Sequence, residues 1–173
     1  MSRFSVSVQS ESFDIGQISA DISEGRTDIG AIVSFTGLVR DFNEKPDVTA
    51  LTLEHYPGMT ESALDNIIQQ ACERWPLQDV RVIHRVGRLT PGDPIVLVVT
   101  ASAHRLAAFD ACAFIMDYLK TQAPFWKKEN TDYGDYWVSA RESDQNAAAR
   151  WVENTETTEH VNSKAQEVNH ESA

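Results

Sequence analysis

Hydrophobic and polar residues alternate along several short segments of the chain and follow a helical spacing in others. Alternation with a period of two predicts strands, and apolar residues three or four positions apart predict helices. Strands are expected at residues 4–8, 29–39, 49–56, 80–86 and 95–100, with a hairpin formed by residues 125–129 and 136–139. Helices are expected at residues 13–22, 60–75, 102–123 and 144–151. This order predicts an α/β or α+β sheet with helices packed on it.

The predicted helix at residues 102–123 has clear signals at both ends. Ser102 is a favourable N-cap residue, and His104 and Arg105 follow it where the first turn should begin. Free backbone N–H groups and the positive end of the helix dipole make such a position receptive to anions. Pro124 ends the helix because it disfavours the helical conformation at Ala123.

A lysine lies within the apolar stripe of this helix. Helical periodicity places Lys120 on one stripe with Arg105, Phe109, Ala113 and Met116. Lys120 therefore either extends its ammonium group past the edge of the core or lies at a pocket. Lys127 follows the break at Pro124 and is close enough in sequence to return toward the same place.

Composition and charge narrow the class of protein. The chain has 173 residues, enough for one domain with a core, and a formal net charge of -11. This charge argues against a general nucleic-acid or membrane-surface binder, since both need a basic face. The first residues contain no apolar leader segment, so we expect a cytoplasmic protein.

The domain boundary is predicted from a change in composition near the C-terminus. Residues 1–151 are expected to form a single catalytic domain, and the polar, acidic residues 152–173 a disordered tail. Cys72 and Cys112 both fall inside predicted helices, which favours small core residues over a disulfide, a metal pair or a nucleophile. We predict neither a metal site nor a cofactor.

The candidate site is a group of cations in an otherwise acidic chain. Arginine suits bidentate binding of phosphate or carboxylate, whereas lysine loses its proton more readily when it is desolvated or crowded by other cations. The group predicts an anionic substrate held by arginines, with a lysine as proton carrier or oxyanion stabiliser. Its members lie at predicted element ends or just past a break: Arg40, His104, Arg105, Lys120, Lys127, Lys128 and Arg141.

Helix geometry limits how these cations can meet. Arg105 and Lys120 are 15 positions apart, so their backbones lie about 22 Å apart along a straight helix. Either they act at opposite ends of an extended ligand, or one subunit borrows His104 and Arg105 from a two-fold mate. The second arrangement is our hypothesis.

Several collinear motifs between residues 29 and 151 resemble the large, catalytic subunit of molybdopterin synthase. They are Phe35-Thr-Gly-Leu-Val-Arg40, Leu53-Glu-His-Tyr-Pro-Gly-Met59, Val82-Ile-His-Arg-Val-Gly87, Ser102-Ala-His-Arg105, Met116-Asp-Tyr-Leu-Lys120, Ala123-Pro-Phe-Trp-Lys-Lys-Glu129 and Ala140-Arg-Glu-Ser-Asp144. The resemblance implies an α/β hammerhead fold, a mixed sheet with packed helices and a small antiparallel β subdomain. It also implies a homodimer within a heterotetramer, in which a small ubiquitin-like subunit with a C-terminal Gly-Gly thiocarboxylate delivers sulfur to cyclic pyranopterin monophosphate.

The resemblance also assigns roles by motif position. Lys120 and Lys127 would be the catalytic lysines. Arg40, His104 and Arg105 would hold the phosphate or the pterin, with Lys128 and Glu129 at the edge of the pocket. Leu38 also belongs to the expected substrate-binding set, but other members often carry a basic residue there, so no side-chain contact is expected from it. The remaining positions of the expected substrate-binding set are Phe35, Val39, Met116 and Arg141.

Two other functions fit the same residues. A non-catalytic scaffold would use Phe125 and Trp126 to dock a ubiquitin-like partner, and would not depend on Lys120. A phosphometabolite hydrolase or transferase would use the helix N-terminus at His104 and would need no protein partner.

Overall fold

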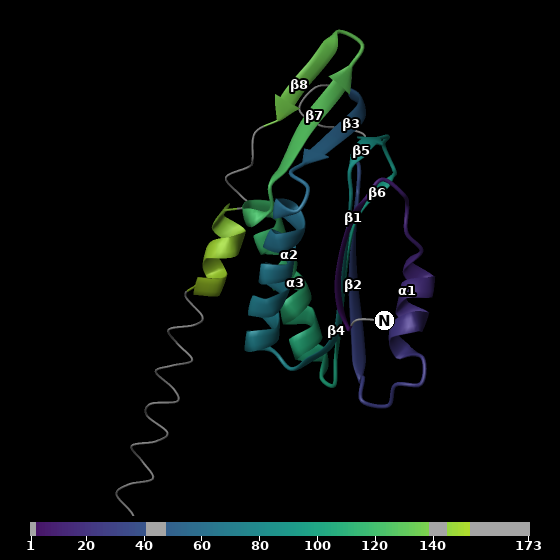
Figure 1. Cartoon of the computed structure of the whole chain (residues 1–173), viewed down its shortest axis with the longest axis vertical. Coiled ribbons are helices and arrows are strands. Elements are labelled where there is room, and N and C mark those ends of the chain that lie inside the picture. The colour runs from purple at the N-terminus through teal and green to yellow at the C-terminus, as the bar shows by residue number, and fades with distance from the viewer. Residues whose placement is uncertain (1–2, 41–47, 139–144, 153–173) are drawn as a thin grey trace, which may run out of the picture.

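The computed structural model describes residues 3–40, 48–138 and 145–152, and within these ranges the strands form two four-stranded sheets (Figure 1). The predicted order of strands and helices is confirmed, and only the short strand β5 was not predicted. In chain order the labelled elements are β1 (Phe4–Gln9), α1 (Ile15–Ser23), β2 (Ala31–Leu38), β3 (Val48–His55), α2 (Met59–Arg74), β4 (Leu77–Arg85), β5 (Gly87–Leu89), β6 (Pro94–Ser102), α3 (Arg105–Gln122), β7 (Phe125–Thr131) and β8 (Gly134–Val138).

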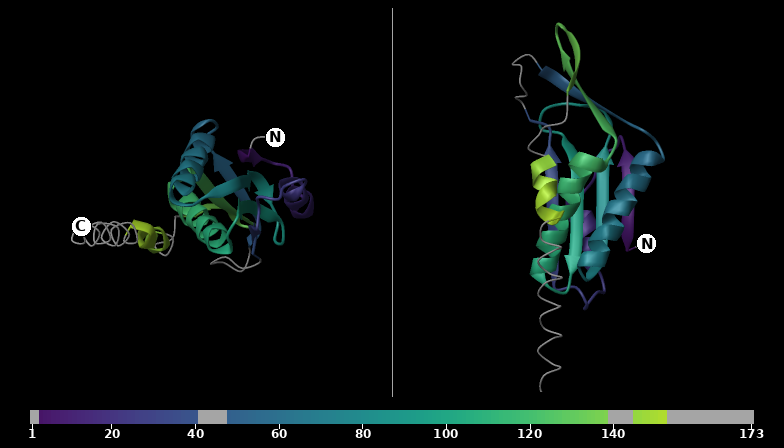
Figure 2. Two further views of the ribbon diagram at one scale, coloured as in Figure 1. Left: turned by 90° about the horizontal axis from the view of Figure 1, so that it is seen from below. Right: turned by 90° about the vertical axis from the view of Figure 1, so that its left-hand side faces the viewer.

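The first sheet is the middle layer of the molecule. Its order is β1-β4-β6-β2; β1 and β4 run parallel, and the other pairs are antiparallel. Helices α2 and α3 cover one face and α1 covers the other (Figures 1 and 2). Strand β6 is buried on both faces, with Val96 and Val98 on the α2–α3 side and Leu97 and Val99 on the α1 side. Burial on both faces explains why β6 is a continuous apolar run. The predicted mixed α/β class is confirmed.

The second sheet is small, antiparallel and extends beyond one end of the first sheet (Figure 2). Its order is β5-β3-β7-β8, and the predicted hairpin is its outer pair of strands. One face has its own core, formed by Val39, Leu51, Leu53 and Leu89 with Ile95 packed against them. This cluster joins the small sheet to the end of β2.

The start of α3 differs from the sequence prediction. Ser102 is the last residue of β6, and the N-cap is His104. The buried Ser102 hydroxyl donates a hydrogen bond to the Pro76 carbonyl at 2.9 Å and accepts one from the His104 N–H at 3.3 Å. The predicted Ser102 cap is therefore wrong, because β6 continues past Thr100. The predicted end is confirmed: α3 stops at Gln122, before Pro124.

The buried face of α3 is also rotated from the predicted stripe. The fully buried positions are Ala108, Ala111, Phe114 and Ile115, whereas Phe109 is 59% exposed and Leu106, about one turn earlier, is 70% exposed. Helix α3 packs on β6 and β2 along its alanine-rich side. The stripe predicted from the sequence therefore lies at the edge of the buried face and not at its centre.

A helical segment at residues 145–152 packs against α3 through Trp151. The indole ring meets Trp75 and Phe114 edge-on, and its N–H donates to the Asp117 carboxylate at 2.8 Å. Arg150 also pairs with Asp117, at 2.6 Å. Apart from Val152, the predicted acidic tail lies outside the described residues. No described helix has the length and apolar character needed to cross a membrane.

Candidate active site

A groove of about 350 Å³ lies between β2 and α3. Two residues of the expected substrate-binding set line it: Phe35, which is 41% exposed, and Met116, which is buried. Lys120 follows Met116 by about one helical turn, so the groove leads to the end of α3 that carries this lysine. The lining residues are Val33, Ser34, Phe35, Phe109, Cys112, Ala113, Met116 and Asp117.

The end of β2 lies at the same end of the molecule as Lys120. Strand β6 runs antiparallel to β2 and leads directly into α3, so α3 returns parallel to β2. Leu38 and Arg40 are exposed there. Val39 is instead buried in the core of the small sheet; its N–H donates to the Asp93 carbonyl at 2.9 Å, and its carbonyl accepts from Gly92 at 2.8 Å. The Val39 side chain is therefore packed in the core of the small sheet, next to the exposed Leu38 and Arg40.

Lys127 faces the body of the molecule from β7. It is paired with Leu53 of β3, and strand alternation places Phe125, Lys127 and the buried Glu129 on one face. Leu53 belongs to the same apolar cluster as Val39. Lys127 therefore lies near the end of β2, at the same end of the molecule as Lys120.

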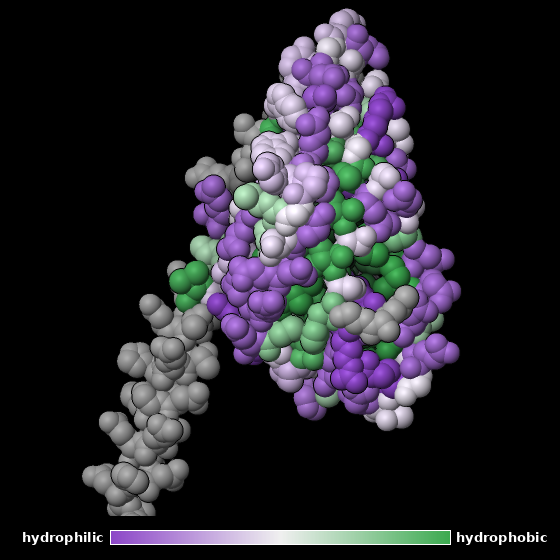
Figure 3. Space-filling view, viewed as in Figure 1, coloured by the Kyte–Doolittle hydropathy of each residue, from purple (hydrophilic) through white to green (hydrophobic). Residues whose placement is uncertain are grey.

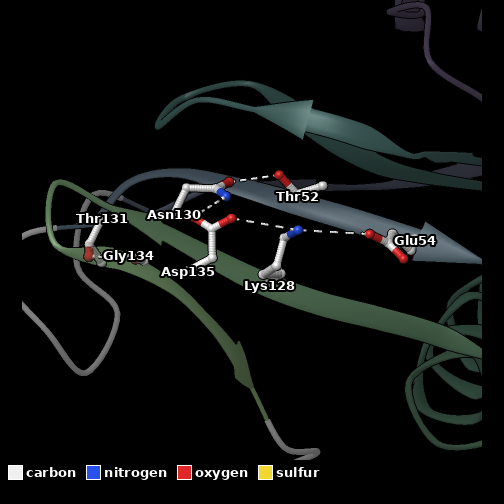
Figure 4. A network of polar contacts seen from close by, with 7 residues as sticks. All are labelled: Thr52, Glu54, Lys128, Asn130, Thr131, Gly134 and Asp135. Carbon is white, nitrogen blue, oxygen red and sulfur yellow. Dashed lines mark hydrogen bonds and ion pairs between the residues drawn. The ribbon is translucent and has the colours of Figure 1, made fainter.

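Lys128 lies on the opposite face of β7 (Figure 4). Its ammonium nitrogen is 3.6 Å from Asp135, 4.0 Å from Glu54 and 5.4 Å from the centre of the Trp137 ring. Asn130 extends the same network by donating to Asp135 and accepting from Thr52. The structure thus separates Lys128 from Glu129 and Lys127, although the sequence suggested that Lys128 and Glu129 would share one edge of the pocket.

His104 and Arg105 are exposed at the other end of α3. Because α3 is continuous from Arg105 to Gln122, the expected separation of about 22 Å from Lys120 holds within one chain. Arg141 lies outside the described residues. One chain therefore brings Arg40, Lys120 and Lys127 to one end and leaves His104 and Arg105 at the other.

A ring stack beside the lysines was not predicted. Nothing in the sequence distinguishes His84 from an ordinary strand residue, but its ring stacks on Phe125 with centroids 3.8 Å apart and planes 18° apart. Burial lowers the pKa of His84 to about 4, so the ring is neutral at neutral pH. Histidines in two separate strands gave no sequence signal, since His55 meets Phe125 through the register of β3 and β7, and His84 meets it through the contact between the two sheets.

The cysteines are free, as predicted, and neither is activated. Cys112 is buried and Cys72 is half-buried. Burial raises the pKa of the Cys112 thiol to about 11 and raises that of Cys72, so both stay protonated at neutral pH.

A second groove, of about 550 Å³, lies between β1 and α2. Apolar side chains gather on this side of the molecule, between α2 and α1 (Figure 3). Asp65 and Glu73 are among the residues that line the groove, with Phe4, Ile68, Gln69 and Cys72. Its charged groups are acidic, so it is a poor receptor for a phosphorylated substrate.

Comparison with known proteins identifies the family. The family model described as "MoaE protein" matches residues 8–122. The chain belongs to the MoaE family. A MoaE relative from Pseudomonas aeruginosa, named "Molybdopterin synthase catalytic subunit", is 57% identical over 148 residues, covering 86% of this chain and 99% of the relative. A protein of the same name from Escherichia coli K12 is 56% identical, covering 87% of this chain and 100% of the relative.

Solved structures confirm the MoaE fold. A MoaE protein from Burkholderia ambifaria is 50% identical with a TM-score of 0.73, and the match covers 84% of this chain and 96% of that one. A molybdopterin synthase structure from Staphylococcus aureus is 31% identical with a TM-score of 0.69, covering 80% and 98%. A complex of the two subunits of the molybdopterin-converting factor from Helicobacter pylori, 17% identical with a TM-score of 0.66, shares the fold. The family predicted from the motifs is thereby confirmed.

Proposed function

We propose that this chain is the catalytic subunit of a molybdopterin synthase and transfers sulfur from the C-terminal thiocarboxylate of a small ubiquitin-like carrier to cyclic pyranopterin monophosphate. The placement of Lys120 and Lys127 carries the assignment of the site. These two lysines flank the break at Pro124, at the end of the molecule to which the β2–α3 groove leads. The names of the MoaE relatives support the reaction class.

The chemistry requires charge and a proton more than a protein nucleophile. A thiocarboxylate sulfur is already nucleophilic, which fits the raised pKa values of both cysteines. Arg40, Lys120 and Lys127 offset the repulsion between the anionic carrier terminus and the substrate phosphate. Lys120 gives a proton to the oxygen that leaves as the carbon–sulfur bond forms, and Lys127 stabilises the developing negative charge. Water then cleaves the thioester to the carrier, so that the sulfur stays on the pterin and the carrier leaves with a C-terminal carboxylate.

Reconstituted sulfur transfer tests this assignment. Purified protein is incubated with the pyranopterin, with and without thiocarboxylated carrier, and dithiolene product is measured. We expect Lys120→Ala to lower kcat by about 10²- to 10⁴-fold and Lys127→Ala by about 10²-fold. Arg88→Ala, which removes an exposed cation from β5 of the same small sheet, is the control and should change kcat less than twofold.

A scaffold or a hydrolase would behave differently. A scaffold needs no lysine for turnover, and a hydrolase or transferase acting on the phosphometabolite needs no carrier. Lys120→Arg separates the two roles of the lysine, since the guanidinium keeps the charge but gives up its proton less readily. Full turnover by Lys120→Arg would show that Lys120 does not carry the proton.

A second copy of the chain completes the site in this proposal. Among the described strands β2 pairs only with β6, which leaves its other edge open over eight residues. The β2 sequence AIVSFTGL contains no charge and no proline, the features that usually protect an edge strand from pairing. Exposed apolar side chains of Phe35, Leu38, Leu106 and Phe109 lie on β2 and α3.

Two-fold pairing along β2 would bring the separated cations together. In an antiparallel β2–β2 pair the Leu38 end of one strand meets the Ala31 end of the other. Because α3 runs parallel to β2, the Arg105 end of one α3 then comes next to the Lys120 end of its mate. The dimer would hold one carrier at each half, as a cytoplasmic heterotetramer. This arrangement supplies His104 and Arg105 to the lysines without a 22 Å reach within one chain.

A further inference from the structure

The chain between the two lysines makes a sharp and well-anchored turn. The Phe125 N–H donates to the Ala123 carbonyl at 2.9 Å, and the buried Thr60 hydroxyl lies 3.5 Å from the Pro124 carbonyl. Lys120 is in the last turn of α3 before this point, and Lys127 lies two residues after Phe125 on the same face of β7. The position of Phe125 therefore sets how the two lysines lie relative to each other.

Phe125 is held by rings from both sheets. His84 of β4, in the first sheet, stacks on it at 3.8 Å between centroids. His55 of β3, the register partner of Phe125 in the small sheet, lies 6.4 Å away with its ring plane inclined by 29°. The three rings connect the two sheets at the place where α3 passes into β7.

The imidazole of His84 has a feature that an apolar ring would lack. Its Nδ1 atom is 2.8 Å from the Arg85 carbonyl oxygen, which only accepts, so Nδ1 carries the hydrogen. This bond fixes the rotation of the ring and hence the plane on which Phe125 stacks. Burying a polar ring that is 6% exposed costs free energy, which a phenyl ring in the same place would avoid.

We propose that His84 is a positioning residue for sulfur transfer: held by the Arg85 carbonyl and stacked on Phe125, it fixes the start of β7 and thereby the placement of Lys127 relative to Lys120. His55 supports the same ring from within the small sheet. This inference rests on the proposed function of the lysine pair. His84 acts through Phe125 and touches no reacting atom.

Three variants and a matched control test this role in the reconstituted enzyme. His84→Leu removes both the stack and the hydrogen bond, His84→Phe keeps only the stack, and Phe125→Leu removes the stack from the other side. The control is Val82→Ala, a core truncation two residues earlier on the same face of β4, where the side chain is 1% exposed. It destabilises the fold but removes none of the three rings.

The expected pattern is a selective loss of kcat. A misplacement of catalytic groups by about 1 Å costs on the order of 10²-fold in rate, so His84→Leu and Phe125→Leu should lower kcat by about 10- to 100-fold. KM for the pyranopterin and Kd for the carrier should stay within about twofold, since the binding residues are untouched. His84→Phe, which keeps the stack but loses the bond to the Arg85 carbonyl, should recover only part of the loss, and Val82→Ala should keep kcat within about twofold.

A second measurement needs no activity. In NMR spectra of isotope-labelled lysine side chains, His84→Leu should shift the Lys120 and Lys127 signals, whereas Val82→Ala should leave them in place. Unchanged lysine signals together with a kcat equal to that of Val82→Ala would overturn the positioning role. Absence of sulfur transfer in the wild-type protein would instead refute the proposed function, and the NMR comparison would still decide whether His84 positions the lysines.

Discussion

Neighbouring residues of β7 face opposite sides of the small sheet, and this alternation separates Lys127 from Lys128. Lys127 shares its face with Phe125 and the buried Glu129, while Lys128 lies in a polar network with Glu54 and Asp135. Partly exposed ion pairs of this kind contribute little to stability. At this scale, the alternation of side chains along β7 decides which lysine can face Lys120.

His84 gives a prediction for the pH dependence of stability. Its pKa in the folded protein, about 4, lies below the ordinary value of 6.5, chiefly because of burial. The unfolded chain therefore takes up a proton at higher pH than the folded one, and the free energy of unfolding falls as the pH drops from about 6.5 to 4. The histidine should account for on the order of 3 kcal/mol of this loss.

Urea unfolding at pH 7, 5.5 and 4 measures this effect. His84→Phe should flatten the pH dependence over this range, because the variant has no titrating group at the buried position. Val82→Ala, which changes no titratable group, should keep the wild-type dependence. A slope of wild-type size in His84→Phe would assign the loss to other groups.

Among the elements, β2 and α3 together form both the groove and the proposed subunit contact. Strand β2 supplies an open, uncharged edge, and α3 lies parallel to it with Phe109 and Leu106 exposed. An exposed apolar edge strand is a template for pairing with another strand. Helix α3 can therefore carry Lys120 into one site and Arg105 into the other.

A lysine placed on the β2 edge should prevent this pairing. Ser34 is exposed in the middle of β2, so Ser34→Lys puts two like charges near the two-fold axis. We expect dimer dissociation to become at least about tenfold more favourable, measured by light scattering across a dilution series, with an unchanged circular dichroism spectrum. Ser5→Lys, on the other edge strand β1, should leave the dimer intact. Equal dimer stability in both variants would place the contact elsewhere.

In the whole molecule, the two ends of α3 are too far apart to bind the same small group within one chain. Arg105 and Lys120 lie at opposite ends of an unbroken helix, and the small sheet with Lys127 adjoins only the Lys120 end (Figure 1). In the proposed dimer, this distance and the direction of α3 relative to β2 place Arg105 of one copy beside Lys120 of the other.

Mixed subunits test the sharing of the site. Arg105→Ala and Lys120→Ala are each inactive in this scheme, but a heterodimer of the two contains one site with all its groups. Because random mixing yields about half heterodimers, each with one complete site of two, recovery should approach about one quarter of wild-type activity. Activity that stays at the sum of the two separate variants would show that each chain uses its own residues.

Local sequence determined most of the secondary structure. The alternation of β1 and β3, the stop at Pro124 and the hairpin that follows it depend on neighbouring residues, and all three were predicted correctly. The family was also recognisable from motifs along the chain. The start of α3 was not, because Ser102 is drawn into β6 by a long-range hydrogen bond to the Pro76 carbonyl.

Tertiary structure decided which residues meet. The exposure of Phe109 and Leu106 depends on how α3 lies against β2 and β6, and the stack of His84 on Phe125 depends on the contact between two sheets. Neither is encoded in the spacing of residues along one element. The sequence therefore determined which cations are present and their order along the chain. Packing and strand direction determined that Arg40, Lys120 and Lys127 lie near one end of α3 and that His104 and Arg105 lie at the other.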